Sequence, residues 1–146
     1  MYTILIDKLC KEGRIQMARE TFHILYLKGL HPNVKTYTAM IWGLCRQGFL
    51  DEAKELFVKM DEDGCSPNDA TYNVIIRGFL GAKRYDEAKV LLKDMVGRGF
   101  SADSSTLEII IDLSKQQQDP IVLEMIESWD LKNICKIKSN LHKGTA

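Results

Sequence analysis

The sequence lacks an excess of charge of either sign. Its 146 residues include 20 Lys and Arg and 20 Asp and Glu, so the formal net charge is zero. A balanced charge provides no general attraction to nucleic acids, and any contact with RNA or DNA would have to be local. The chain also has no apolar run approaching the ~20 residues that cross a bilayer. The composition therefore argues against a membrane partner and favours one soluble globular unit.

Targeting signals are also missing from the start of the sequence. The segment MYTILIDKLCKEGR has no long apolar stretch and contains Asp7 and Glu12. Secretory signals need an apolar region, and transit peptides are poor in acidic residues. We therefore expect neither kind of targeting peptide in this segment.

Residue sets that carry chemistry are scarce as well. The cysteines form no Cys-x-x-Cys pair and the histidines are scattered, which argues against a metal site. These residues are Cys10, Cys45, Cys65, Cys135, His23, His31 and His142. Reduced cysteines packed as small hydrophobic side chains are favoured over disulfides in an extracellular setting. Because no Ser–His–Asp set, phosphate-binding loop or deaminase-type zinc set is recognisable, the sequence predicts no enzyme activity, cofactor or small-molecule substrate.

The sequence does contain one pattern that is repeated three times. The segments that align without gaps are MYTILIDKLCKEGRIQMARETF, TYTAMIWGLCRQGFLDEAKELF and TYNVIIRGFLGAKRYDEAKVLL. Equivalent residues are 35 apart in four series: Tyr2, Tyr37 and Tyr72; Ile6, Ile41 and Ile76; Ala18, Ala53 and Ala88; Gly29, Gly64 and Gly99. Self-similarity at a fixed period identifies a repeat protein.

Each repeat carries two amphipathic helical patterns. In the second repeat, apolar residues at helical spacing predict a first helix over about 36–47 and a second over about 50–63. Gly48 and Gly64 end these helices, and Pro67 prevents any continuation. A helical hairpin cannot bury its apolar face alone, so the repeats are expected to stack into an all-α solenoid.

The period also predicts the organisation of the chain. Repeats are expected at 1–33, 34–68 and 69–103, followed by a C-terminal cap of two or three helices over 104–146. The cap begins with SSTLEIIIDLSKQ, which resembles the start of a fourth first helix. Four lysines and no acid follow Leu131, and a solvated tail is favoured over contact with RNA for this stretch.

Paired carboxylates begin the second helices of the second and third repeats. They are Asp51 with Glu52 and Asp86 with Glu87. Adjacent helix residues do not face each other, which argues against a catalytic carboxylate pair. We expect them instead to complement the positive end of the helix dipole.

The repeat resembles the pentatricopeptide repeat (PPR) in its plain 35-residue form. Each opening contains Tyr-Thr/Asn-x-x-Ile, and the second repeat continues with Gly-Leu-Cys-x-x-Gly. Tetratricopeptide repeats instead have a 34-residue period and a Trp-x2-Leu-Gly-x2-Tyr opening. The match runs along TYTAMIWGLCRQGFLDEAKELFVKMDEDGCSPN and covers about 1–103, with a half-motif to about 115. The resemblance implies a right-handed superhelix of helical hairpins.

The resemblance further implies binding of single-stranded RNA, with one base per repeat. In this family the base is read by the residue after the tyrosine and by the last residue of the repeat. The matching positions are Thr3 with Asn33, Thr38 with Asn68, and Asn73 with Asp103. Thr with Asn resembles an adenine reader and Asn with Asp a uracil reader, so the expected RNA sequence is A-A-U. Lys35 and Ala70 occupy the place beside the base where the family usually has an aliphatic side chain.

Two alternatives stay open at this point. Thr, Asn and Asp also favour helix starts, so the six base-reading candidates could serve only as helix caps. Helical-repeat grooves also hold peptides, so a protein–protein interaction scaffold is the competing function. Family habit places PPR proteins in plant mitochondria or chloroplasts, where they act in RNA processing, stability or translation.

Some positions depart from the repeat pattern. Lys8 replaces the glycine found at Gly43, Lys83 replaces the glycine found at Gly48, and Ala102 replaces a proline. The sequence also begins inside its first repeat, so we expect it to be the C-terminal end of a longer array.

Overall fold

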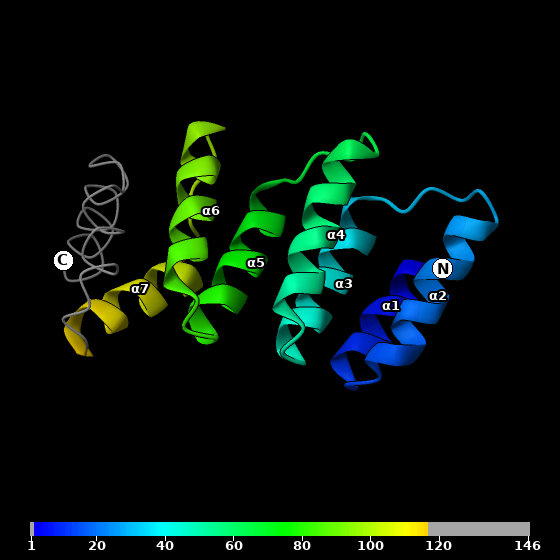
Figure 1. Cartoon of the computed structure of the whole chain (residues 1–146), viewed down its shortest axis with the longest axis horizontal. Coiled ribbons are helices and arrows are strands. Elements are labelled where there is room, and N and C mark those ends of the chain that lie inside the picture. Colours follow the sequence, from blue (N-terminus) through cyan, green and yellow to red (C-terminus); the bar gives the residue numbers. More distant parts are fainter. Residues whose placement is uncertain (1, 117–146) are drawn as a thin grey trace, which may run out of the picture.

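The computed structural model describes residues 2–116, which fold into seven α-helices without a strand. The helices are α1 (Tyr2–Lys11), α2 (Ile15–Leu27), α3 (Val34–Arg46), α4 (Leu50–Glu62), α5 (Asp69–Gly81), α6 (Tyr85–Gly97) and α7 (Ser104–Gln116). Figure 1 shows them following one another along the long axis as successive hairpins, which confirms the predicted all-α solenoid. Of the predicted cap, α7 is the part inside this range. Its further helices and the lysine-rich stretch lie outside the described residues.

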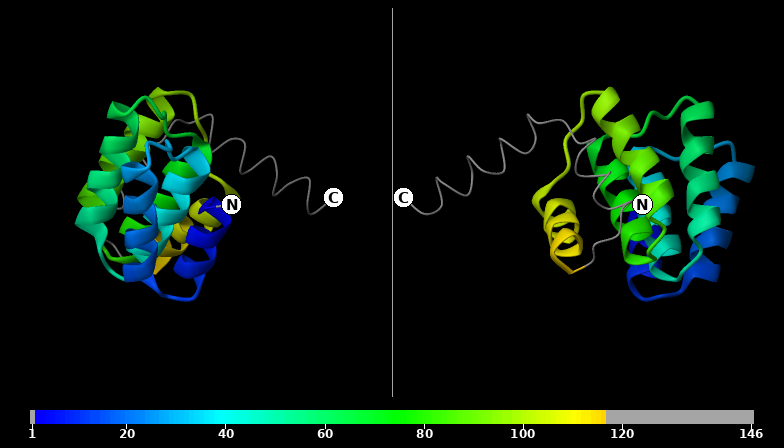
Figure 2. Two further views of the ribbon diagram at one scale, coloured as in Figure 1. Left: turned by 90° about the vertical axis from the view of Figure 1, so that its right-hand side faces the viewer. Right: turned by 60° about the vertical axis from the view of Figure 1, so that its left-hand side comes forward.

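The helices form two layers. The first helices of the hairpins, α1, α3, α5 and α7, contact one another in series. The second helices, α2, α4 and α6, pack against the first helix of their own hairpin, and α2 and α4 also contact the first helix of the next hairpin. Figure 2 (left) looks along the array and shows the two layers side by side. The stack is therefore held together mainly through the first-helix layer.

Apolar burial joins the neighbouring repeats. In α3, Tyr37, Ile41 and Leu44 are at most 1% exposed, and in α4 both Ala53 and Met60 are completely buried. They belong to one continuous cluster that extends from α1 to α7. Because burying apolar surface contributes about 25 cal/mol per Å², covering each hairpin with the next is the main source of stability.

Two glycines mark the closest approach between first helices. A Cβ atom added at Gly43 would lie 2.5 Å from Cys10 Sγ, and one added at Gly78 would lie 2.6 Å from Cys45 Sγ. Any larger residue at these glycines would therefore push the repeats apart. Lys8, at the equivalent place in the first repeat, is exposed and has no preceding first helix among the described residues.

The three cysteines in the described range are unpaired. Cys10 is buried, and Cys45 and Cys65 are half-buried. They behave as the small hydrophobic side chains that the sequence favoured, whereas Cys135 lies outside the described residues.

The tight turn within each hairpin uses a left-handed residue. Gly13 and Gly48 have φ angles of +78° and +87°, and Lys83 has a φ angle of +63° at the equivalent place in the third repeat. A residue with a Cβ atom is strained in this region by about 1–2 kcal/mol, whereas glycine is not.

Replacing Lys83 with glycine should therefore raise the free energy of unfolding by about 0.5–1 kcal/mol, after the entropy cost of glycine is subtracted. Lys93→Gly is the matched control, because Lys93 is exposed inside α6. There, glycine should lower the free energy of unfolding by about 1 kcal/mol. Urea unfolding of both variants measures the two shifts, and shifts of the same sign would contradict the argument.

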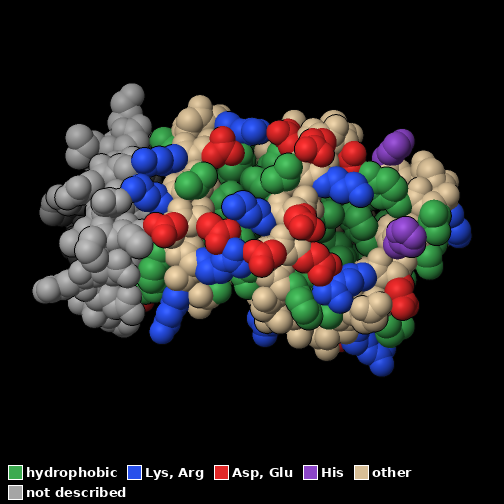
Figure 3. Space-filling view, in the orientation of Figure 1, with side chains coloured by type: hydrophobic (Ala, Val, Ile, Leu, Met, Phe, Trp, Pro, Cys, Tyr) green, Lys and Arg blue, Asp and Glu red, His purple; other side chains and the backbone are tan. Residues whose placement is uncertain are grey.

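Ion pairs connect successive hairpins on the second-helix side. Three of these pairs are Arg19–Glu52 at 2.7 Å, Arg84–Asp51 at 2.6 Å and Lys54–Glu87 at 3.3 Å. Their acidic residues lie in the first turns of α4 and α6, as predicted from the sequence. Figure 3 shows this face, with acidic and basic side chains interspersed over it. Pairs this exposed contribute only about 0–1 kcal/mol each, so they orient the hairpins more than they stabilise them.

Candidate functional site

A groove of about 630 Å³ runs along the first-helix layer, lined by residues of α1, α3 and α5. Five of the eight predicted site residues line it: Thr3, Lys35, Thr38, Asn68 and Ala70. The other three, Asn33, Asn73 and Asp103, do not. The structure therefore brings Thr3, Thr38 and Asn68 to one surface together with the flanking residues Lys35 and Ala70.

A chain of side-chain hydrogen bonds links each repeat to the next along this groove. The residue after each tyrosine position contacts a threonine of the following repeat. The contacts are Thr3 Oγ1 with Thr36 Oγ1 at 2.7 Å, Thr38 Oγ1 with Thr71 Oγ1 at 2.9 Å, and Thr106 Oγ1 donating to Asn73 Oδ1 at 2.8 Å. We call Thr36, Thr71 and Thr106 the bridging threonines.

The last residue of each repeat contacts the same bridging threonine. Asn68 Oδ1 accepts hydrogen bonds from Thr71 N and Thr71 Oγ1, both at 3.0 Å. Asn33 Oδ1 accepts from Thr36 in the same way, at 2.9 and 2.8 Å. Asn33 and Asn68 are thus the N-caps of α3 and α5, as the capping alternative predicted.

Capping leaves part of each asparagine available. The caps use the amide oxygen, and no hydrogen bond donated by Nδ2 of Asn33 or Asn68 is found among the described residues. An amide nitrogen carries two donors, so each side chain can cap a helix and still donate to a ligand. Capping and ligand contact are therefore compatible at these positions.

The bridging threonines were missed by the sequence reasoning. They are at most 1% exposed, and their hydroxyl groups orient both predicted residues of a pair. A signal for them was present, because Thr36, Thr71 and Thr106 recur at the 35-residue period.

The pair in the third repeat is arranged differently. Asn73 is only 3% exposed. Its Nδ2 donates to the carbonyls of Asp69 and Ser101 at 2.7 and 3.2 Å, and its Oδ1 accepts from Asp103 N and Thr106 Oγ1, both at 2.8 Å. Two donors and two acceptor positions are the full capacity of an amide side chain. Asn73 is therefore fully engaged within the protein.

Asp103 is exposed but also has protein partners. Arg77 Nη1 donates to its two carboxylate oxygens at 3.1 and 2.9 Å, and Thr106 N donates to Oδ1 at 2.9 Å. Partial burial acts to raise the pKa of Asp103, but the bonds from Thr106 and the charge of Arg77 outweigh it and lower the pKa below its usual value. Asp103 is consequently a carboxylate at neutral pH.

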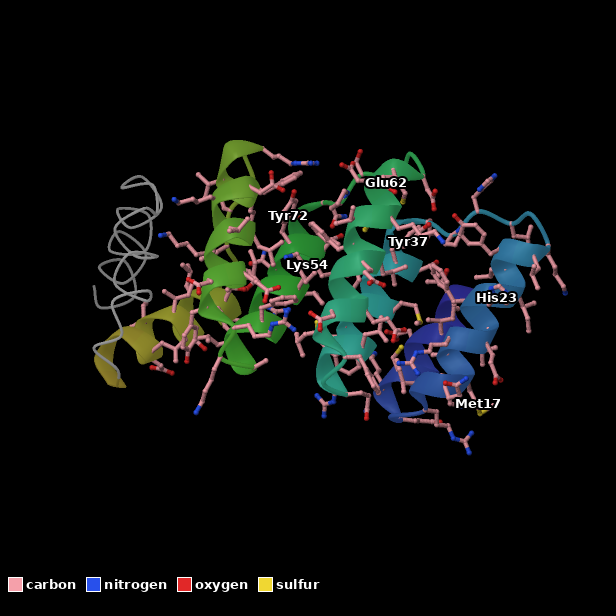
Figure 4. All side chains as sticks on the ribbon, in the orientation of Figure 1. Met17, His23, Tyr37, Lys54, Glu62 and Tyr72 are labelled. Carbon is pink, nitrogen blue, oxygen red and sulfur yellow. The ribbon has the colours of Figure 1, made fainter. Side chains whose placement is uncertain are left out.

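Two buried tyrosines support the groove from behind. Tyr37 OH donates to Asp63 at 3.1 Å and Tyr72 OH donates to Asp94 at 2.5 Å. Burial, followed by the neighbouring carboxylates, raises the pKa of both phenols well above the usual range. Figure 4 shows both tyrosines within their own hairpins. They fix the backbone just before Thr38 and Asn73.

Other kinds of site find no support within residues 2–116. No cluster of three or more His, Cys, Asp or Glu side chains in that range could hold a metal ion. None of its helices has the length and apolar character needed to cross a membrane.

Comparison with known proteins points to one family. The sequence model of the PPR repeat family matches the chain three times, at residues 1–46, 32–81 and 70–115. No curated protein matches the chain by sequence.

The fold is similar to solved structures of PPR10. One is PPR10 in complex with an 18-nt psaJ RNA element, at 22% identity and a TM-score of 0.74 over 90% of this chain and 20% of that chain. Another is PPR10 from maize, at 27% identity and a TM-score of 0.64 over 85% of this chain and 18% of that chain. The chain therefore spans about a fifth of the length of these structures.

Proposed function

The chain belongs to the PPR repeat family, and from that premise we propose that it binds single-stranded RNA in the groove of its first-helix layer. The observation that carries the proposal is the shared orientation of Thr3 and Thr38. They lie on successive first helices, line one groove, and are each held by a bridging threonine. Thr38 Oγ1 donates its proton to the Val34 carbonyl at 2.7 Å, so hydroxyl oxygens at this regular spacing can meet the edges of successive unpaired bases as acceptors.

We further propose that the pairs Thr3–Asn33 and Thr38–Asn68 each favour adenine and that Asn73–Asp103 favours uracil. The proposed RNA sequence is A-A-U. The available Nδ2 donors of the two asparagines support discrimination in the first two repeats. Because Asn73 has all its hydrogen bonds satisfied within the protein, we expect weaker discrimination at the third base.

Lys35 and Ala70 are the proposed flanking residues. Both are exposed in the first turn of a first helix and line the groove. The Lys35 ammonium group can approach a phosphate, whereas the methyl group of Ala70 offers only a small apolar contact.

The expected affinity is low. Three base contacts contribute about 1–3 kcal/mol each, while association costs about 4–15 kcal/mol. The net charge of zero adds little attraction to phosphates. We therefore expect a dissociation constant above micromolar for this chain alone.

A titration at low salt tests the proposal. The chain should bind labelled single-stranded RNA containing A-A-U more tightly than RNA of the same composition in scrambled order, as measured by fluorescence anisotropy. Tight binding that does not depend on the RNA sequence would contradict base reading by the repeats. Binding of an extended peptide without binding of RNA would favour the interaction-scaffold alternative. The observation behind that alternative is the apolar lining of the groove by Ile4, Ala39 and Val74.

The Thr38→Asn substitution tests the second position of the code. An amide presents a different donor and acceptor pattern from a hydroxyl, so the preference at the second base should move away from adenine. The change corresponds to about one hydrogen bond, or roughly a fivefold to tenfold loss of affinity for A-A-U. Thr21→Asn, on α2 outside the groove, is the matched control and should leave the preference unchanged.

We propose that the cellular role is RNA processing, stability or translation in a mitochondrion or chloroplast. This part rests on family membership. Crosslinking of the protein to RNA in intact cells would test it, and recovery of nuclear or cytosolic transcripts alone would contradict it.

A further inference from the structure

Trp42 occupies a place in the groove that the repeat pattern does not require. It lies four residues after Thr38 in α3, on the same helix face, and it is half-buried. Its equivalents at the 35-residue period are Asp7 and Arg77, which are charged and ion-paired. An aromatic side chain at this position is therefore particular to the second repeat and is not among the residues that recur every 35 positions.

Trp42 also lies where two cavities of the first-helix layer meet. It lines the groove of about 630 Å³ and a second cavity of about 410 Å³ between the C-terminal ends of α3 and α5. The indole is thus reachable from both sides. A single RNA strand that follows the groove from Thr3 past Thr38 toward α5 would pass the indole of Trp42.

The surroundings of Trp42 suit a polyanion. The guanidinium carbon of Arg46 lies 5.1 Å from the centre of the indole ring, which holds the ring in place and keeps a positive charge beside it. The two cavities are lined by four cations and one acid: Lys11, Lys35, Arg46, Arg77 and Asp7. Lys11 is paired with Asp7 and Arg77 with Asp103, so Lys35 and Arg46 supply the local excess of positive charge in a chain without net charge.

We propose that Trp42 is an additional RNA-contacting residue, whose indole stacks on an unpaired base beside the one that Thr38 contacts. The inference rests on the proposed RNA binding. Every base has a π-face, so stacking on an indole adds affinity without selecting a base. Trp42 therefore strengthens binding, and the Thr and Asn pairs supply discrimination.

Fluorescence provides a direct test, because the chain has two tryptophans. In a Trp129→Phe background, Trp42 is the single tryptophan, and adding A-A-U RNA should quench its emission with the same midpoint as the anisotropy of labelled RNA. In addition, Trp42→Leu keeps an apolar side chain and should weaken binding of A-A-U and scrambled RNA alike, by about tenfold.

Phe49→Leu is the matched control. Phe49 is 43% exposed, and the guanidinium carbon of Arg19 lies 4.5 Å from its ring centre, but it does not line the groove. It reproduces the aromatic–arginine pair away from the proposed RNA path, so its substitution should leave RNA affinity unchanged.

The outcomes separate this inference from the proposed function. RNA binding with constant Trp42 emission and an unchanged affinity of Trp42→Leu would overturn the inference and leave the proposed function intact. No RNA binding by the unaltered chain would overturn both. Should Trp42→Leu fail to fold by circular dichroism, the quenching measurement, which retains Trp42, decides the question.

Discussion

Gly78→Ala should lower the free energy of unfolding by about 1–3 kcal/mol, although alanine is the better helix former. The added Cβ would lie 2.6 Å from Cys45 Sγ and 2.7 Å from Cys45 Cβ, both in the preceding first helix. The Cβ atom of Cys45 is fixed by the backbone and cannot rotate away, so α3 and α5 would have to separate. The separation would disturb the apolar contacts between the second and third repeats.

Gly81→Ala is the matched control in the same helix. No atom lies within 4 Å of a Cβ added at Gly81, and the residue is exposed at the end of α5. There, alanine should stabilise the protein by about 0.4–1 kcal/mol through the unfolded state. Urea unfolding should thus give opposite signs for the two variants. Stabilisation by Gly78→Ala would show that the repeats can separate without cost.

A double-mutant cycle locates the clash. Cys45→Ala removes the sulfur atom, which is the nearer of the two contacts with a Cβ at Gly78. The variant that combines Cys45→Ala with Gly78→Ala should therefore lose less stability than the sum of the single variants. Strict additivity would place the strain elsewhere.

The helices could be predicted from the sequence because their signals are local. The second helix of the second repeat was expected over about 50–63 and spans Leu50–Glu62. The first was expected from about 36 and begins at Val34. The difference arises because the side chain of Asn33 accepts a hydrogen bond from Thr36 N, which caps the helix two residues earlier.

The contacts between repeats could not be predicted by aligning the repeats. Thr38 contacts Thr71, which is 33 residues later, and Cys45 packs on Gly78 at the same separation. Equivalent residues are 35 apart, so residues that touch are two positions out of register in the alignment. For this reason the roles of Thr71 and Gly78 emerged only from the structure.

Part of the candidate site could be predicted from the pattern within a single repeat, and part of it could not. Thr3 and Thr38 face the groove because the first-helix stripe fixes which side of each helix is buried. The burial of Asn73 depends on Ser101 and Thr106, which belong to the chain on either side of the next repeat boundary. A pattern within one repeat contains no information on such partners.

The stability of the fold should fall steeply at alkaline pH, and two buried thiols should contribute about 2–3 kcal/mol of the loss between pH 8 and pH 10. Burial raises the pKa of Cys45 from 9.0 to about 12, and burial together with Asp7 raises that of Cys10 from 9.0 to about 11. The unfolded chain therefore releases these two protons near pH 9, whereas the folded chain keeps them. Stability is fully present below pH 9 and is lost as pH rises toward 11–12.

Urea unfolding at several pH values, with a reducing agent, measures this loss. Cys45→Ala removes one of the two thiols and should reduce the loss between pH 8 and pH 10 by roughly 1.4 kcal/mol. Cys65→Ala is the matched control, because burial raises the pKa of the half-buried Cys65 thiol by less. An equal pH dependence in the unaltered chain and the Cys45→Ala variant would mean that the Cys45 thiol ionises freely between the first helices. The close packing of Cys45 on Gly78 argues against that, since a thiolate there would need water where the neighbouring backbone now lies.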